Sequence, residues 1–319
     1  MRTLTLRRTL ASIALSAPLT LPGCVDTSGC PEAKQEQILL APTLDAELAA
    51  LVQSCKTDQN CEPLCAKVYE RKYGYPADGF TECALTADTA TNRDLVIYTP
   101  EVFCVGGRRP AGYRSGQHDG DRVGAYLAQQ AELEAASVRA FADLHADLRA
   151  LGAPASLVRA VIAAAADEVR HAATCELLAR RHGGSPELRM IEAAPRRSAR
   201  ALAVDNLVEG CIRETYGAVL AGYQARAARD PEVRAAMQQI ALDEAKHAAL
   251  SWKLDAWLRP QLSADDRRAL HDAAEAARDE LALEVGECDG ALRDVAGLPD
   301  AETARGMLAQ LETSVWSAI

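Results

Sequence analysis

A seven-residue stretch that occurs twice is the strongest constraint on the fold. The residues Asp-Glu-Val-Arg-His-Ala-Ala at 167–173 return as Asp-Glu-Ala-Lys-His-Ala-Ala at 243–249, seventy-six positions later. Both copies lie in long runs rich in Ala, Leu, Arg and Glu without an internal Pro or Gly, which predicts helix. Glu and His three positions apart on a helix lie about 60° from each other, so both side chains reach one point. A carboxylate and an imidazole at one point suit a transition metal.

Each copy follows an earlier Glu by nearly the same number of residues. Glu134 precedes Glu168 by 34 positions, and Glu209 precedes Glu244 by 35. Turn signals divide each half, at 152–154 and at 230–231. A helix of ~20 residues is ~30 Å long, so an antiparallel return over this spacing brings the second helix level with the first Glu. Each half therefore predicts a helical hairpin that carries one Glu and one Glu-x-x-His.

The alternative interpretation of the repeat is a solvated helix surface. A single Glu-x-x-His in a chain this rich in Glu fits that interpretation well. Two copies with matched hairpin spacing do not. Carboxylates buried together without cations are costly or stay protonated, so an intact set of these residues indicates bound metal.

A second acidic residue on the third helix competes with Glu209. Glu214 lies 30 positions before Glu244. On an α-helix it points about 140° away from Glu209, so both cannot contact the same metal pair. The matched spacing favours Glu209, with Glu214 as its substitute.

The whole pattern resembles the ferritin-like di-iron carboxylate superfamily, which includes bacterioferritins and rubrerythrins. The resemblance covers about residues 122–258 and implies a four-helix bundle with a crossover over 182–196. It also implies two iron ions, with manganese or zinc as alternatives, and Glu168 and Glu209 as the bridging carboxylates. The metal ligands implied by position are Glu134, Glu168, His171, Glu209, Glu244 and His247.

Residues beside the predicted ligands also repeat. Asp167 and Asp243 precede each Glu, and Arg170 and Lys246 precede each His. They fit either outer partners of the metal ligands or salt bridges between helices. Tyr216 shares a face with Glu209 and fits either the border of the metal pocket or the core.

The N-terminus has the pattern of an export signal. Arg2, Arg7 and Arg8 precede an apolar run from Leu10 to Leu21, which is too short for a membrane span. The following Leu-Pro-Gly-Cys resembles a bacterial lipoprotein cleavage box, although Pro departs from the usual pattern. The expected mature chain begins at a lipidated Cys24 and is held at a membrane of the cell envelope by lipid alone.

The charge of the chain excludes polyanionic partners. The full chain has a net charge of −10, and removal of residues 1–23 takes away three Arg and no acidic residue, which gives −13. Nucleic acid and anionic headgroups repel such a chain.

Residues 24–120 are richer than the rest of the chain in Cys, Gly and Pro and contain most of the Tyr. Six Cys in an exported segment of this size predict disulfides, with three pairs expected. They are Cys30, Cys55, Cys61, Cys65, Cys83 and Cys104. Helices are expected over 44–55 and 63–73, and the Gly-rich residues 105–112 have the composition of a linker, with a cover over the bundle mouth as the alternative. The Cys61–Cys65 spacing resembles a zinc motif, but no second pair completes it.

Residues 259–319 predict two further helices that cover a bundle face. Ser263 is the expected N-cap of the first, with acidic residues in its opening turn. Among the Cys in helical context, Cys211 is expected in the core. Cys175 with Cys288, or Cys288 with Cys104, are alternative disulfides.

The predicted protein is mainly α-helical, with a signal over 1–23, a Cys-rich segment over 24–120, a ferritin-like bundle over 121–258 and a helical cover over 259–319. The predicted function is an exported di-iron carboxylate protein that reacts with dioxygen or peroxide. The alternative is a non-enzymatic metal-binding or structural lipoprotein on the same scaffold. The sequence leaves the substrate, the native metal and the oligomeric state open.

Overall fold

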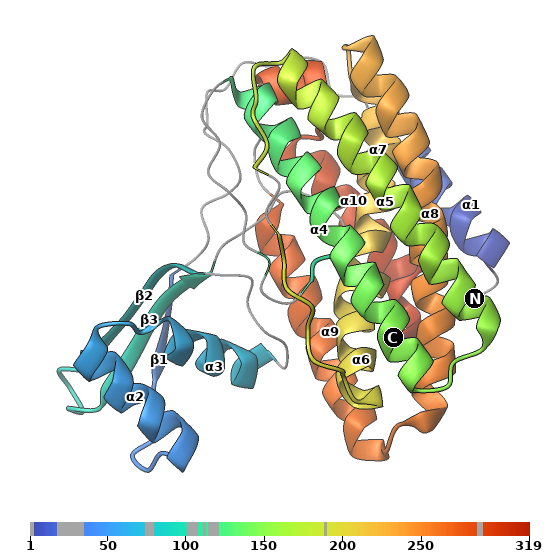
Figure 1. The fold of residues 1–319 in the computed structure, drawn as a ribbon. Helices are drawn as coiled ribbons and strands as arrows, with labels where there is room; N and C mark the ends of the chain where they lie inside the picture. Colours follow the sequence, from blue (N-terminus) through green and yellow to red (C-terminus); the bar gives the residue numbers. More distant parts are fainter. Residues whose placement is uncertain are drawn as a thin grey trace. The chain divides into compact units, whose positions relative to one another are not determined.

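The computed structural model describes residues 3–17, 35–73, 80–100, 108–110, 113, 121–187, 190–285 and 290–319. Helix predominates in these ranges, which also contain a small antiparallel sheet (Figure 1), and this confirms the prediction of a mainly α-helical protein. The chain forms two compact units, of which one is Glu32–Phe103 and the other combines Met1–Pro31 with Cys104–Ile319.

The smaller unit combines a sheet with two helices. Its strands β1 (Glu36–Leu39), β2 (Phe80–Ala87) and β3 (Asp94–Pro100) are antiparallel in the order β1-β3-β2. Its helices are α2 (Ala46–Asp58) and α3 (Glu62–Tyr73), close to the predicted bounds. The sheet was not predicted, although Val96 and Tyr98 show the alternating burial typical of a strand.

Among the described residues of this unit, the disulfides Cys55–Cys61 and Cys65–Cys83 join its helices and its sheet. The prediction of disulfides is confirmed for these four residues, while Cys24, Cys30 and Cys104 lie outside the described residues. Each sulfur of the Cys61–Cys65 motif is bonded to a different cysteine, so the motif cannot hold zinc. Tyr69, Phe80 and Tyr98 pack edge to face beside the disulfides, with ring centroids 5.4–6.1 Å apart.

Two helical hairpins form the centre of the larger unit. The first joins α4 (Arg122–Ala150) to α5 (Ala155–Arg181) through a four-residue connection, and α4 packs along α5 (Figure 1). The second joins α6 (Ala199–Asp205), a π-helix η1 (Asn206–Glu214) and α7 (Thr215–Ala227) to α8 (Pro231–Leu258). Helix α8 packs against η1, α7 and α5. The sequence predicts these four helices over 121–151, 156–183, 197–228 and 231–258, and the observed ends lie within two residues of these bounds.

The π-helix η1 changes the predicted orientation of Glu214 relative to Glu209. Its hydrogen bonds run from residue i to i+5 rather than i+4, so residues five positions apart complete about one turn. Glu209 and Glu214 therefore share a face, whereas α-helical geometry separated them by about 140°. All nine residues of η1 are buried, which means that packing against neighbouring helices sustains its unusual hydrogen bonding.

The C-terminal helices belong to the larger unit. Helix α9 (Ala264–Glu284) contacts α6 and η1, and α10 (Ala301–Ser314) contacts α7. The predicted N-cap Ser263 forms a capping box with Asp266. Between these helices lies the π-helix η3 (Leu292–Ala296), and short 3-10 turns, η2 (Arg259–Gln261) and η4 (Trp316–Ala318), follow α8 and α10. Trp316 donates a hydrogen bond from Nε1 to the carbonyl of Cys211 at 3.0 Å, so the C-terminal segment is fixed to η1.

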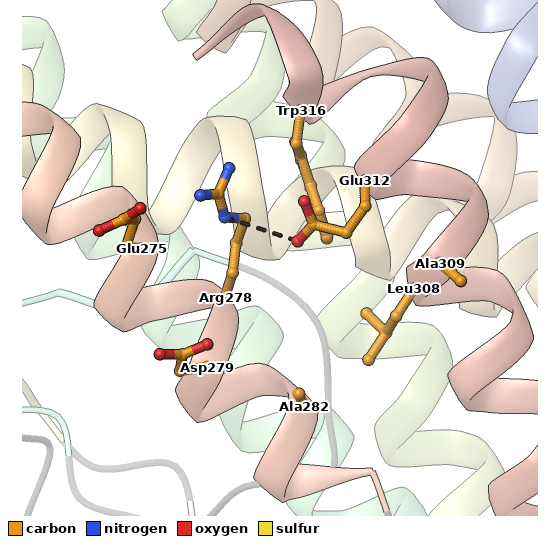
Figure 2. A pocket seen from close by; sticks show the side chains of 8 residues that line it. All are labelled: Glu275, Arg278, Asp279, Ala282, Leu308, Ala309, Glu312 and Trp316. Carbon is orange, nitrogen blue, oxygen red and sulfur yellow. Dashed lines mark ion pairs between the residues drawn. The ribbon is translucent and has the colours of Figure 1, made fainter.

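A pocket of about 460 Å³ lies between α9 and α10 (Figure 2). Arg278 of α9 reaches toward Glu312 of α10, with 3.5 Å between Nε and Oε1. The other lining groups include Glu275, Asp279 and Trp316. The pocket shares no residue with the carboxylate and histidine cluster described below.

The described part of the predicted export signal contains α1 (Thr3–Ser16), which packs on α7, α8 and α10. Leu6, Leu10 and Ile13 are buried there, and Arg226 of α7 donates to the carbonyl of Ala14. Of the helices that the structure describes, none combines the length and the apolar character needed to cross a bilayer.

Candidate metal centre

Five of the predicted ligands converge inside the larger unit. Glu134 comes from α4, Glu168 and His171 from α5, and Glu244 and His247 from α8. Each of the five is between 2% and 6% exposed, so the cluster is closed to bulk water.

The two imidazoles present the same ring nitrogen to the carboxylates. His171 Nδ1 lies 3.5 Å from Glu134 Oε2, 3.6 Å from Glu168 Oε2 and 3.5 Å from Glu244 Oε1. His247 Nδ1 lies 2.9 Å from Glu168 Oε1 and 3.3 Å from Glu244 Oε1. Glu168 and Glu244 thus each contact both imidazoles, which places them between the two.

The inward-facing nitrogen and oxygen atoms of the cluster lie close together, but several of them form no hydrogen bond with one another. Within the described part of the chain, His171 Nδ1, His247 Nδ1 and Glu244 Oε1 are buried and make no hydrogen bond. The short distances therefore lack the alignment of an N–H···O bond. Buried polar atoms are nearly always paired, so three orphaned atoms in one cluster point to a ligand that accepts lone pairs.

The spacing of the atoms fits coordination of a cation. One ligand atom each from Glu134, Glu168, His171 and Glu244 can be chosen so that all four lie within 4.8 Å of one another. Four ligands about 2.1 Å from a tetrahedral ion stand about 3.4 Å apart. The distances from His171 Nδ1 to the three carboxylates, 3.5–3.6 Å, are close to this value. The residues present therefore fit a metal ion with three oxygen ligands and one nitrogen ligand.

The repeated aspartates hold the outer nitrogens of the imidazoles. His171 Nε2 lies 3.4 Å from Asp243 Oδ2, and His247 Nε2 lies 3.3 Å from Asp167 Oδ2. Each aspartate orients the histidine of the other hairpin, which points Nδ1 inward. This geometry favours the outer-partner interpretation for the aspartates. Arg170 and Lys246 are exposed and pair with these aspartates at the surface.

The pKa values of the clustered carboxylate and imidazole groups are shifted so that these groups retain protons. Burial, with the neighbouring Glu168 carboxylate, raises the pKa of Glu134 to about 8. Burial by itself would lower the pKa of His171, but the carboxylates of Glu134, Glu168 and Glu244 raise it to about 11. Burial likewise opposes the charge of His247, yet Glu244, Asp167 and Glu168 raise its pKa well above the usual value. Protons thus supply the charge that a metal ion would provide.

Glu209 and its substitute Glu214 are engaged by two consecutive arginines. Arg109 donates to Glu209 from its backbone N–H at 3.1 Å, from Nε at 3.2 Å and from Nη2 at 3.1 Å. Arg108 donates from Nε to Glu214 Oε1 at 3.1 Å, and Ser251 donates to Glu214 Oε2 at 2.7 Å. The structure therefore places the predicted sixth ligand, Glu209, against a guanidinium rather than against an imidazole.

Sequence reasoning missed Arg108 and Arg109. Residues 105–112 were expected to be a linker, and the described residues 108–110 instead enter the larger unit. Their contacts with Glu214 and Glu209 fit the alternative of a cover better than a linker. The one signal in the sequence was a pair of cations in a Gly-rich stretch, and this composition does not reveal a partner about 100 residues away.

The structure also describes three other residues that the sequence analysis considered. Tyr216 is buried on α7. Cys175 and Cys211 are buried free thiols whose pKa is raised by burial. The proposed pairing of Cys175 with Cys288 is therefore wrong, and Cys288 lies outside the described residues.

Comparisons with models of protein families, with curated proteins and with solved structures found no match for this chain.

Proposed function

We propose that the two hairpins form a ferritin-like four-helix bundle and that the buried cluster holds two iron ions that react with dioxygen or peroxide. The observation that carries the proposal is the set of orphaned inward atoms, His171 Nδ1, His247 Nδ1 and Glu244 Oε1. They belong to the two helices that carry the repeated Glu-x-x-His, and the ferritin-like superfamily uses such motifs for di-iron sites.

The chain supplies position, charge and dryness. Glu168 and Glu244 each contact both imidazoles, so these two carboxylates, rather than the expected pair of Glu168 and Glu209, would serve both cations. Asp243 and Asp167 hold the imidazole rings with Nδ1 inward, which keeps the lone pair accessible to a metal. Bound iron would supply one-electron chemistry with an oxidant, and the buried side chains would keep bulk water away from it.

Iron reconstitution tests this function directly. The metal-free protein is loaded anaerobically with Fe(II), exposed to dioxygen or peroxide, and followed by near-ultraviolet absorbance and by oxidant consumption. The wild type is expected to consume oxidant with turnover, and Glu168→Ala is expected to lose both iron and turnover. Glu176→Ala is the matched control on the same helix, because Glu176 pairs with Arg180 at the surface. Equal turnover in Glu168→Ala and wild type would contradict the proposal.

A structural metal site is the second candidate. It is favoured by the distances of 3.5–3.6 Å from His171 Nδ1 to three carboxylates, which are close to the ligand spacing of a four-coordinate zinc site. In this case the protein purified from its own host contains zinc, ignores oxidant after iron loading, and loses stability when a chelator removes the metal. Metal analysis of that protein separates the two candidates.

We also propose that the protein is exported and anchored by lipid on Cys24. The support is the sequence of residues 1–24, in which basic residues and an apolar run precede Leu-Pro-Gly-Cys. Mass spectrometry of the mature protein is expected to find a diacylglycerol-modified Cys24 as the first residue, and Cys24→Ala is expected to release the protein from membranes. An unmodified mature N-terminus at another position would refute the anchor.

A further inference from the structure

Arginines are already paired with the two carboxylates of η1. Glu209 is bound by Arg109 and lies 3.8 Å from Arg213 Nε, and Glu214 is bound by Arg108. Among the described residues, no Arg or Lys lies within ion-pair distance of Glu134, Glu168 or Glu244, whose charged neighbours are the two imidazoles. The attraction for an added cation is therefore strongest around these three carboxylates and weaker at Glu209.

The arginine pair is built into the unit rather than lying on its surface. The Arg108 side chain is 1% exposed and donates to Asp205 at 3.1 Å and to Asn206 and Ser251 at 3.2 Å. Its guanidinium stacks 5.5 Å from the ring centre of Phe141, which in turn contacts His247 edge to face.

The backbone of the strap, defined here as residues 108–110, is also fixed. Ser137 of α4 donates from Oγ to the Arg108 carbonyl at 2.6 Å, and the Arg109 N–H donates to Glu209. Gly210 of η1 makes room for this strap, because a methyl group there would overlap Arg108 Nη2 and Ser251. The local sequence of η1 is thus compatible with the inserted arginine.

We propose that Arg109 competes with the second metal ion for Glu209, so that the two metal positions of the cluster fill with unequal affinity. The inference rests on the proposed metal function. The first position uses Glu134, Glu168, His171 and Glu244, whose ligand atoms already face one another. The second position uses His247, whose Nδ1 faces Glu168 and Glu244. Glu209 is the further ligand that the resemblance implies, and a cation beside His247 would use it only after Glu209 leaves Arg109.

Glu214 is the alternative carboxylate of η1 for the second metal position. Its carboxylate is held by both Arg108 and Ser251 and is 1% exposed. Release of Glu214 would leave Arg108 unpaired in the interior, and such a charge is costly. Glu209, with its more exposed side chain at 12%, is the residue better able to change partner.

Metal stoichiometry tests the competition without any activity measurement. The metal-free full chain is titrated with Co(II), with visible absorbance and equilibrium dialysis as readouts. The wild type is expected to bind one equivalent tightly and a second at least tenfold more weakly. Arg109→Gln is expected to tighten the second equivalent at least tenfold while leaving the first unchanged. Arg259→Gln is the matched control, since it removes an arginine paired with a buried aspartate, Asp255, outside the cluster.

Circular dichroism verifies that each variant is folded. Should Arg109→Gln fail to fold, Arg109→Lys replaces it, because lysine keeps the charge and loses the two-pronged contact with Glu209. This variant is expected to tighten the second equivalent about threefold or more.

The outcomes separate the two proposals. Two equally tight equivalents in the wild type, or an unchanged second equivalent in the folded Arg109 variant, would overturn the competition and leave the metal function standing. The absence of saturable binding in the wild type, or binding that is unaffected by Glu168→Ala, would overturn the metal function and the competition with it.

Discussion

Asp243 provides the sharpest test of how the cluster is organised, because it reaches His171 from the opposite hairpin. Its Oδ2 lies 3.4 Å from His171 Nε2 and 3.0 Å from Gln239 Nε2, and its residue is 1% exposed. Asp243→Asn keeps the shape of the side chain and removes its charge. The imidazole then loses the partner that holds Nδ1 inward and strengthens its lone pair.

The size of the effect follows from the geometry. Loss of an outer partner of a metal-bound histidine typically lowers metal affinity by about 10- to 100-fold. The distance of 3.4 Å is longer than a well-formed N–H···O bond, and asparagine retains one acceptor oxygen, so the lower end applies. We expect the dissociation constant of the first Co(II) equivalent to rise about tenfold, or about 1.4 kcal/mol.

Isothermal titration of the metal-free protein measures this change. Asp143→Asn is the control, because Asp143 is also a buried aspartate in the same unit, and it pairs with Arg139 away from the cluster. The control is expected to keep the wild-type affinity. If Asp243→Asn binds metal as tightly as the wild type, or if Asp143→Asn loses as much affinity, the argument for cross-hairpin orientation of the imidazoles is refuted.

Three further predictions concern pH and packing. Burial raises the pKa of Glu134 from its ordinary value of 4.5 to about 8. Its contribution to the stability of the metal-free protein is therefore complete below pH 4.5 and is lost as the pH rises toward 8. In thermal unfolding, Glu134→Gln should lose less stability over this pH range than the wild type. Metal affinity should rise over the same range as protons leave Glu134, with proton release on binding visible in buffers of different ionisation enthalpy, and a pH-independent affinity would contradict this. Gly210→Ala should lower the free energy of unfolding by about 1–3 kcal/mol through overlap with Arg108 and Ser251, whereas an unchanged denaturation midpoint would mean that the strap is not inserted.

The third helix shows why part of the site escaped prediction. The hairpin spacing favoured Glu209, and the assumption of α-helical geometry then excluded Glu214 from the same metal pair. The π-helix η1 places both on one face, and its irregular hydrogen bonding is supported by burial from several neighbouring elements. Local sequence preferences contain little information about such support, so the exclusion of Glu214 rested on a geometry that the fold does not adopt.

The amino-acid sequence by itself determined the helices of the two hairpins and five of the residues in the cluster. Helical periodicity and the return length of a hairpin are local properties, so residue spacing alone relates the positions of Glu134, Glu168, His171, Glu244 and His247. Only the tertiary structure decided that Asp243 and Asp167 each contact the histidine of the other hairpin. It also decided the partners of Glu209 and the insertion of Arg108 and Arg109. These contacts join residues about 70 to 140 positions apart, and they form only because packing brings their backbones together and burial then requires each charge to find a partner.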